Sequence, residues 1–252
     1  MAFVITLPRE TLEEVIKCPL VLRQNANADF TPEKLILSAV SEERKDLVRV
    51  EAGKATFTEY NSDAHEIVWP LGKLAGILEL AEPREEITLS YEMGSANMDV
   101  EVGNLLRRMC FGTRGRDFDL KPLQYDFTIK SSARELWRAV KAAEAAGYVE
   151  MSVRLRDKEL VFETFSNSDR DATVLTLPEE ELEIIHEGKL KDVRGAYSIK
   201  YLSKFVDKLN VPKVELQFAK KLPLIIRAPL YGFNNVDPTG NVTFVTVPIT
   251  DV

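Results

Sequence analysis

The chain has 252 residues and a mass of 28.5 kDa, with 33 Lys and Arg residues against 40 Asp and Glu, which gives a formal net charge of −7. Its 45% hydrophobic and 29% charged residues predict a packed core and exclude an intrinsically disordered chain. The N-terminal residues lack the pattern of a signal peptide, and no apolar run approaches the roughly 20 residues of a membrane-spanning helix, so we expect a cytosolic protein without a membrane segment.

Residue types that carry catalysis or bind metals are sparse. The chain has two cysteines, Cys18 and Cys110, and two histidines, His65 and His186, which lie far apart in the sequence. Two cysteines are too few for a disulfide scaffold, and each histidine lies in a polar stretch that predicts a solvated loop or strand end. No Gly-Lys pair is followed by the Ser or Thr of a phosphate-binding loop. We therefore expect no catalytic residue, no metal site and no cofactor.

The first half of the chain alternates strand and helix patterns. Residues 3–6 predict a strand, an apolar strand follows at residues 35–38, and another at residues 87–90. Apolar residues at helical spacing predict a helix before each of the last two strands. The helix before residues 35–38 contains Leu12, Val15 and Ile16, and the helix before residues 87–90 contains Leu71, Leu74, Ile77 and Leu78. Residues 100–102 alternate apolar and charged side chains, as in a sheet with one face covered by helices and the other in water.

The second half repeats this order of patterns. A strand at residues 127–130 leads into a helix with Leu136, Trp137 and Val140, and a later helix at residues 199–206 precedes a strand at residues 214–217. Between the halves, residues 112–126 combine glycines, a proline and charged residues, which is typical of a connector. This internal repeat predicts an α+β fold with two duplicated domains, residues 1–111 and 127–252, joined by the connector of residues 112–126.

Positive charge gathers on the predicted helices of the second half. Arg134, Arg138 and Lys141 recur at helical spacing, on the face opposite the one that we assign to Leu136, Trp137 and Val140. In the later helix, Lys200, Lys204 and Lys208 recur every fourth residue. Like charges at this spacing destabilise a helix slightly, so two such stripes favour a surface for a polyanion over the alternative, a solvated helix face.

Taken together, these features resemble the sliding clamps of the proliferating cell nuclear antigen (PCNA) type. The resemblance spans nearly the whole chain and rests on the duplication, on Ala-Tyr-Ser-Ile-Lys-Tyr-Leu at residues 196–202, on Lys-Leu-Pro-Leu-Ile-Ile at residues 221–226, and on the apolar ending at residues 242–249. It implies a trimeric ring with antiparallel sheets outside and helices lining the inner face. The implied function is that of a polymerase processivity factor that encircles duplex DNA and tethers replication and repair proteins, without catalysis or a cofactor.

The resemblance also implies roles for individual positions. Non-sequence-specific contacts with DNA would come from Lys17, Lys73, Arg134, Arg138, Lys141, Lys200, Lys204 and Lys208. Client peptides would bind at Val40, Phe118, Leu120, Pro223, Val245 and Pro248. The alternative interpretation of these positions is that they pack in the core. Ring closure would pair the edge strands at residues 104–111 and 165–175 of neighbouring subunits, bringing Arg107 and Arg108 to Asp169 and Asp171.

The implied partners are duplex DNA, DNA polymerase and other clamp-binding replication and repair proteins, and a clamp loader. The location would be the cytoplasm, associated with the nucleoid, in an archaeon and the nucleus in a eukaryote. The chain departs from the family pattern where Arg114 and Arg116 enter the connector and where Val247 replaces an alanine of the tail. Besides a homotrimeric clamp, two alternatives stay open: a subunit of a heterotrimeric or specialised clamp that does not self-assemble, and an enzyme of duplicated α+β fold.

Overall fold

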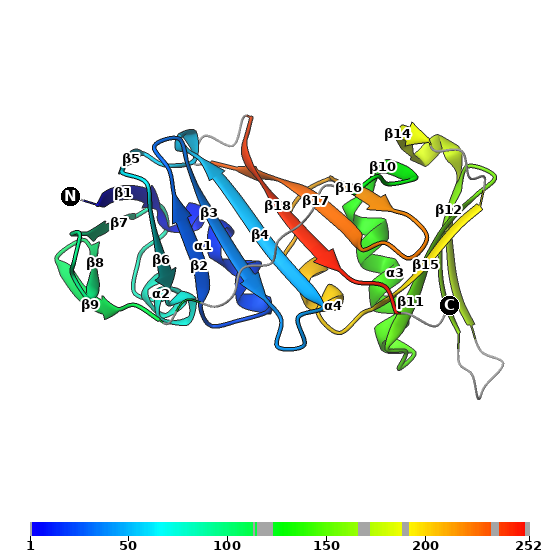
Figure 1. Ribbon diagram of the computed structural model, residues 1–252, viewed down its shortest axis with the longest axis horizontal. Coiled ribbons are helices and arrows are strands. Elements are labelled where there is room, and N and C mark those ends of the chain that lie inside the picture. The colour runs from blue at the N-terminus through cyan, green and yellow to red at the C-terminus, as the bar shows by residue number, and fades with distance from the viewer. Residues whose placement is uncertain are drawn as a thin grey trace. The chain divides into compact units, whose positions relative to one another are not determined.

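The computed structural model describes residues 2–112, 114, 123–165, 172–187, 192–232 and 237–249. The chain divides into two compact units: unit 1 comprises Met1–Asp119 and Pro229–Val242, and unit 2 comprises Leu120–Ala228 and Thr243–Val252. Each unit contains antiparallel sheets and helices, so the predicted α+β class is confirmed (Figure 1).

The order of elements is the same in the two halves of the chain. The first half consists of β1 (Phe3–Pro8), α1 (Arg9–Lys17), β2 (Ala26–Phe30), β3 (Lys34–Val40), β4 (Asp46–Gly53), β5 (Glu59–Ser62), β6 (His65–Trp69), α2 (Leu71–Leu78), β7 (Glu86–Tyr91), β8 (Asn97–Val102) and β9 (Leu105–Cys110). The second half consists of β10 (Phe127–Ser132), α3 (Ala133–Ala145), β11 (Glu150–Arg156), β12 (Glu159–Phe165), β13 (Ala172–Leu177), β14 (Glu183–Glu187), β15 (Asp192–Ser198), α4 (Leu202–Val206), β16 (Lys213–Phe218), β17 (Leu224–Tyr231) and β18 (Pro238–Thr246).

Strand pairing repeats as well. The strands of the first half form the orders β5-β1-β7-β8-β9 and β6-β2-β3-β4, and those of the second half form the orders β14-β10-β16-β17-β18 and β15-β11-β12-β13. In this repeat β9 corresponds to β18, and β4 corresponds to β13. Residues 238–242 of β18 belong to unit 1, where they lie beside β4, whereas residues 243–246 belong to unit 2.

The core of each unit lies between its helices and its sheets. In α1 the side chains of Leu12, Val15 and Ile16 are at most 1% exposed, and in β3 the alternate residues Leu35 and Leu37 are fully buried. The two helices of each unit contact one another, α1 with α2 and α3 with α4. Burying side chains of this size contributes roughly 1.5–3 kcal/mol each, so the apolar periodicity fixes which face of each element points inward.

The last helix is shorter than the sequence predicts. Lysines at residues 200, 204 and 208 were expected on one continuous helix, but α4 spans only Leu202–Val206, and Lys200 precedes it while Lys208 follows it. Strand β15 runs through Ser198, and Pro212 disfavours helical backbone at the residue before it. Turn hydrogen bonds flank α4 instead, with Ser203 donating to the Ile199 carbonyl and Lys208 to the Phe205 carbonyl.

Two further expectations need correction. Trp137 does not share the buried face of α3 with Leu136 and Val140, because its side chain is 43% exposed. It lies three residues after Arg134 and four before Lys141, and this spacing places it on the cationic face. The expected strand at residues 165–175 is also wrong in its bounds, since Phe165 ends β12 and the edge strand is β13.

Within the described ranges, no helix is long and apolar enough to cross a lipid bilayer.

Candidate nucleic-acid interface

Helix α3 carries the first group of cations, and its local sequence sets its start. The hydroxyl of Ser132 accepts a hydrogen bond from the Glu135 amide and caps the helix. Arg134 and Arg138 are exposed and Lys141 is partly buried, while Leu136 and Val140 pack inward. The expected cationic face of α3 is therefore present at the surface of unit 2.

Acidic neighbours neutralise part of this face. Arg138 pairs with Glu135 at 2.8 Å, and Lys141 pairs with Glu144 at 2.7 Å and with Asp207 at 2.6 Å. Burial by itself would lower the pKa of Lys141, but its hydrogen bonds to the two carboxylates outweigh burial and raise the pKa. Lys141 thus stays charged, but its charge is balanced locally, which leaves Arg134 as the α3 cation with the most accessible charge.

Two of the three lysines around α4 lie over an aromatic ring. The ammonium groups of Lys200 and Lys204 lie 4.9 Å and 5.8 Å from the centre of the Tyr201 ring. A cation over an exposed ring gains roughly 0.5–1 kcal/mol without losing its charge. Lys204 and Lys208 are exposed. Because α3 contacts α4 and Lys141 reaches Asp207, both groups of cations lie in one region of unit 2.

Unit 1 offers a weaker cationic surface. Lys17 ends α1 and pairs with Glu14 of the same helix, and its side chain is only 16% exposed. Lys73 is exposed on α2. These two residues were the only positions of the first half that the sequence analysis assigned to DNA, and one of them is locally neutralised.

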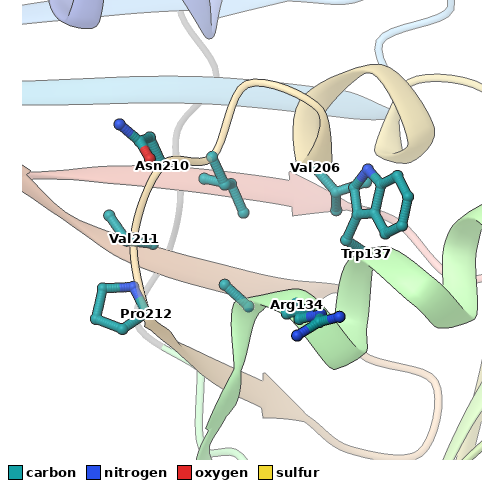
Figure 2. A pocket seen from close by; sticks show the side chains of 8 residues that line it. Arg134, Trp137, Val206, Asn210, Val211 and Pro212 are labelled. Atoms are coloured by element: carbon teal, nitrogen blue, oxygen red, sulfur yellow. The ribbon is translucent and has the colours of Figure 1, made fainter.

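A pocket of about 310 Å³ opens beside the α3 cations, between the start of α3 and the segment after α4 (Figure 2). Its lining residues are Ala133, Arg134, Trp137, Val206, Leu209, Asn210, Val211 and Pro212. The indole Nε1 of Trp137 donates a hydrogen bond of 2.8 Å to Asp207 Oδ1, so the ring is held in place at the pocket. Trp137 was not expected at the surface, although its spacing from Arg134 and Lys141 is that of a residue on the cationic face.

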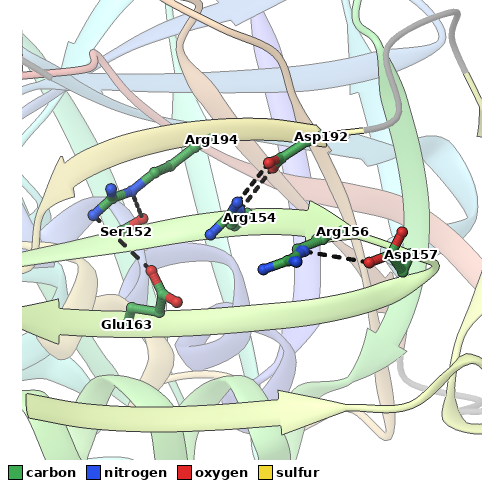
Figure 3. Close-up of polar contacts among 7 residues, drawn as sticks. All are labelled: Ser152, Arg154, Arg156, Asp157, Glu163, Asp192 and Arg194. Atoms are coloured by element: carbon green, nitrogen blue, oxygen red, sulfur yellow. Dashed lines mark hydrogen bonds and ion pairs between the residues drawn. The ribbon is translucent and has the colours of Figure 1, made fainter.

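A second group of arginines, on the sheet of unit 2, is paired with acids throughout (Figure 3). Arg154 lies directly opposite Arg194 on strands β11 and β15. Arg154 forms a bidentate pair with Asp192, and Arg194 bonds to Ser152 and approaches Glu163 at 4.0 Å. The pKa of Asp192 is lowered chiefly by its hydrogen bond from Arg154. These pairs offset the repulsion between facing arginines, so this cluster is a weaker candidate for binding an anion.

The positions assigned to client peptides fall in different parts of the chain. Val40 is the partly buried last residue of β3 in unit 1. In unit 2, Tyr197 bridges to Pro248 and donates to the Leu222 carbonyl at 3.2 Å, which connects the segments of Pro248 and Pro223. Val245 is 1% exposed and packs in the core, in keeping with the alternative interpretation for this residue. Phe118 and Leu120 lie outside the described residues.

The strands assigned to ring closure lie at sheet edges. Strand β9 is an edge of the five-stranded sheet and exposes Leu105 and Leu106. Strand β13 is an edge of the four-stranded sheet β13-β12-β11-β15 and exposes Val174. Arg107 is exposed, whereas Arg108 already forms a bidentate pair with Asp99, at 2.8 Å and 3.0 Å. Asp169 and Asp171 lie outside the described residues.

In the described part of the chain, no cluster of three His, Cys, Asp or Glu residues has the geometry to hold a metal. His65 begins β6, at a strand end as expected, but its ring is partly buried and is stacked on Phe30 with 4.5 Å between ring centres. Burial lowers its pKa, against the effect of the Asp63 carbonyl that accepts a bond from Nδ1. His65 is thus part of an aromatic cluster in unit 1.

Known proteins with similar sequence and fold are sliding clamps. No family model matches the chain, but it is 23% identical over 249 residues to proteins named DNA polymerase sliding clamp from Methanosarcina acetivorans and Methanosarcina mazei, over 95% of this chain and 95% of each relative. The structure of PCNA from Thermococcus kodakaraensis matches with a TM-score of 0.83 at 20% identity, over 98% of this chain and 100% of that one. PCNA from A. fulgidus, solved with the C-terminal region of FEN-1, matches with a TM-score of 0.84 at 18% identity, over 99% of both chains. The resemblance indicated by the sequence is confirmed: over nearly its whole length, this chain has the fold of a PCNA-type sliding clamp.

Proposed function

We propose that this protein is a DNA sliding clamp, a polymerase processivity factor that encircles duplex DNA and tethers replication and repair proteins. The observation that carries the proposal is the likeness to sliding clamps in both sequence and fold over nearly the full length of the chain. Its work is to bind and to hold rather than to catalyse, so it needs no cofactor.

The repeat itself supports ring closure between copies. Residues 238–242 of β18, the counterpart of β9, lie in unit 1 beside β4, the counterpart of β13. Strands β9 and β13 are both sheet edges, and an edge strand presents unpaired amide and carbonyl groups for pairing with another chain. We propose that β9 of one copy pairs with β13 of the next. Such a head-to-tail contact closes into a ring, here of three copies as in the family that the chain resembles.

In this ring, the cations of the helices would face the phosphates of duplex DNA. The contacts would be non-specific and salt-sensitive, because a protein that slides cannot read base edges. The residues proposed to contact DNA remain Lys17, Lys73, Arg134, Arg138, Lys141, Lys200, Lys204 and Lys208, with the exposed and ring-held cations of unit 2 contributing most.

Client proteins would dock through short peptides. The solved complex of A. fulgidus PCNA with a FEN-1 fragment supports peptide binding in this family. For this chain we propose the positions Val40, Phe118, Leu120, Pro223, Val245 and Pro248, with DNA polymerase and a clamp loader among the partners. The domain bounds 1–111 and 127–252, with the connector 112–126 between them, belong to the same proposal. The sequence relatives are archaeal, which favours a location at the nucleoid.

The first test is the mass of the isolated protein by size exclusion coupled to light scattering. Three copies of the 28.5 kDa chain give about 86 kDa, which is well separated from a monomer. A trimer supports a self-sufficient clamp. A monomer at micromolar concentration would favour the alternative, a subunit of a heterotrimeric or specialised clamp, and would contradict the homotrimer.

The second test asks whether topology retains the protein on DNA. The protein is threaded onto linear duplex from one open end, that end is then blocked, and the complex is washed at high salt, which removes phosphate contacts but not encirclement. We expect retention on the blocked duplex and release after a nuclease cuts it. Equal loss from blocked and open duplex would contradict the sliding-clamp proposal.

A further inference from the structure

The pocket beside Trp137 combines an exposed aromatic ring with a cation at its edge. Trp137 is 43% exposed, and Arg134, one turn earlier on α3, lines the same pocket (Figure 2). The remaining lining residues are mostly apolar, with Val206, Val211 and Pro212 on the side of α4 and the segment after it. A ring, a guanidinium and an apolar wall are the groups with which proteins hold an unstacked base and its phosphate.

We infer that this pocket binds one unpaired nucleobase of single-stranded DNA, stacked on Trp137, with the adjoining phosphate on Arg134. This inference rests on the proposed function, since it places nucleic acid at the cationic face of unit 2, and it adds a site for single-stranded DNA. The pocket, of about 310 Å³, is large enough for one nucleobase. A duplex, whose bases are stacked and paired, would reach only the cations around it.

The indole is fixed in place before any ligand arrives. Its Nε1 is bonded to Asp207, and Asp207 is itself held by Lys141 at 2.6 Å. A ring that is already ordered loses little conformational entropy when a base stacks on it. The bond also occupies the indole's only hydrogen-bond donor, so the ring offers its faces for stacking.

Charge around the pocket favours an anionic ligand. Arg134 is exposed, and within the described residues no acid lies within ion-pair distance of it. Lys204 and Lys208 are exposed on the neighbouring α4 region. Asn210 adds an amide with donors and an acceptor for a base edge. An apolar peptide side chain would use the wall of the pocket but gain nothing from these cations, which is why we favour a nucleotide.

The test compares two labelled oligonucleotides of equal length, an oligothymidylate and an abasic strand, by fluorescence anisotropy. Both carry the same phosphates, but only the first carries bases. We expect the oligothymidylate to bind about tenfold more tightly, as one base–aromatic stack provides. Equal affinity for the two strands would overturn the proposal.

Variants assign the difference to the pocket. Trp137→Ala should remove the preference for the base-carrying strand, and Trp137→Phe should keep most of it. Lys204→Ala, a matched cation outside the lining residues, should weaken both strands equally. A preference that survives in Trp137→Ala, with the melting temperature unchanged, would overturn the proposal.

Intrinsic fluorescence gives a second readout, because the chain has two tryptophans and Trp69 is fully buried. Quenching of the wild-type emission by oligothymidylate therefore reports on Trp137. Quenching by an apolar peptide but not by oligothymidylate would contradict the inference. Both assays use free protein and single strands, so their failure is distinguishable from failure of retention on blocked duplex.

Discussion

Asp207 connects the two helical regions of unit 2 through single side-chain contacts. Its carboxylate accepts a hydrogen bond from Trp137 Nε1 at 2.8 Å and pairs with Lys141 at 2.6 Å. Burial alone would raise the pKa of Asp207, but the hydrogen bonds from Lys141 and Trp137 outweigh burial and lower the pKa. One carboxylate thus both orients the exposed indole and balances a cation of α3.

The first prediction separates these two roles of Asp207. Asp207→Asn keeps an acceptor for the indole and removes the charge, whereas Asp207→Ala removes both. The side chain is 41% exposed, so solvent screens the pair, and we expect a loss of under about 1 kcal/mol for Asn and about 1–2 kcal/mol for Ala. Urea unfolding measures both, with Glu144→Ala as the control. Wild-type stability of Asp207→Ala would contradict this role.

The second prediction concerns the pH dependence that His65 introduces. His65 is stacked between partners in unit 1, 4.5 Å from Phe30, 5.4 Å from Phe3 and 5.8 Å from Tyr91 between ring centres. Burial lowers its pKa below the ordinary 6.5, although the Asp63 carbonyl and carboxylate act in the opposite direction. The unfolded chain therefore binds the proton more readily, and stability falls as pH drops from 6.5 through the lower folded pKa.

We expect the melting temperature of the wild type to fall across this window more steeply than that of His65→Gln, which cannot be protonated there. Calorimetry at a series of pH values measures the difference. His186→Gln, at an exposed residue of β14, is the matched control and should follow the wild type. Parallel curves for the wild type and His65→Gln would contradict the prediction.

Strand β9 combines an open edge with uneven charge pairing. Arg108 is bonded within the same sheet to Asp99, whose pKa is lowered chiefly by that hydrogen bond, whereas Arg107 is exposed. Both arginines were expected at the subunit interface. The structure indicates that Arg107 is the better candidate for a contact with the next copy.

The third prediction is that reversing both charges, Arg107→Glu with Arg108→Glu, weakens assembly, and that Arg107→Glu alone accounts for most of the effect. Exposed pairs are worth about 0–1 kcal/mol each, so we expect a several-fold rise in the dissociation constant. Light scattering over a dilution series measures it. Lys45→Glu, in the exposed turn after β3, is the control. Assembly as tight as wild type in the double variant would refute the prediction.

Element lengths show where sequence patterns were insufficient. The apolar periodicity placed α1, α2 and the start of α3 correctly, because burial of one helix face is a local property of the sequence. The lysines at residues 200, 204 and 208 fitted a longer helix than α4, which ends at Val206. Helix α4 is short because it lies between β15 and the extended chain before β16. The spacing of the lysines carries no information about these neighbouring segments.

Cations that are paired with acids inside the molecule should contribute less to binding DNA than cations that are not. The fourth prediction compares two combined variants. The first is the triple variant Arg134→Ala, Lys204→Ala and Lys208→Ala. The second is the double variant Arg138→Ala and Lys141→Ala, which removes the two cations that form ion pairs. Removing one cation from a phosphate lowers the magnitude of the negative slope of log K against log salt by about 0.9. We expect the magnitude of this slope to fall by about 2–3 in the first variant and by under about 1 in the second.

Duplex binding at a series of salt concentrations measures these slopes. As a control, both variants should have the oligomeric state and the melting temperature of the wild type, so that they differ from it in charge alone. An equal fall of the slope in the two variants would show that the internal ion pairs do not decide which cations meet DNA, and would contradict the prediction.

Spacing and composition were enough to predict the internal repeat, the α+β class, most of the buried helix positions and the family that the chain resembles. These features depend on the spacing and the types of residues along the chain, which can be read without knowing the fold. Only the tertiary structure decided which cations are balanced by acids, that Trp137 is exposed at a pocket, and that β9 and β13 are sheet edges. The reason is physical: Asp207 meets Lys141 and Trp137 across a long stretch of chain, and such contacts arise only when distant segments pack together.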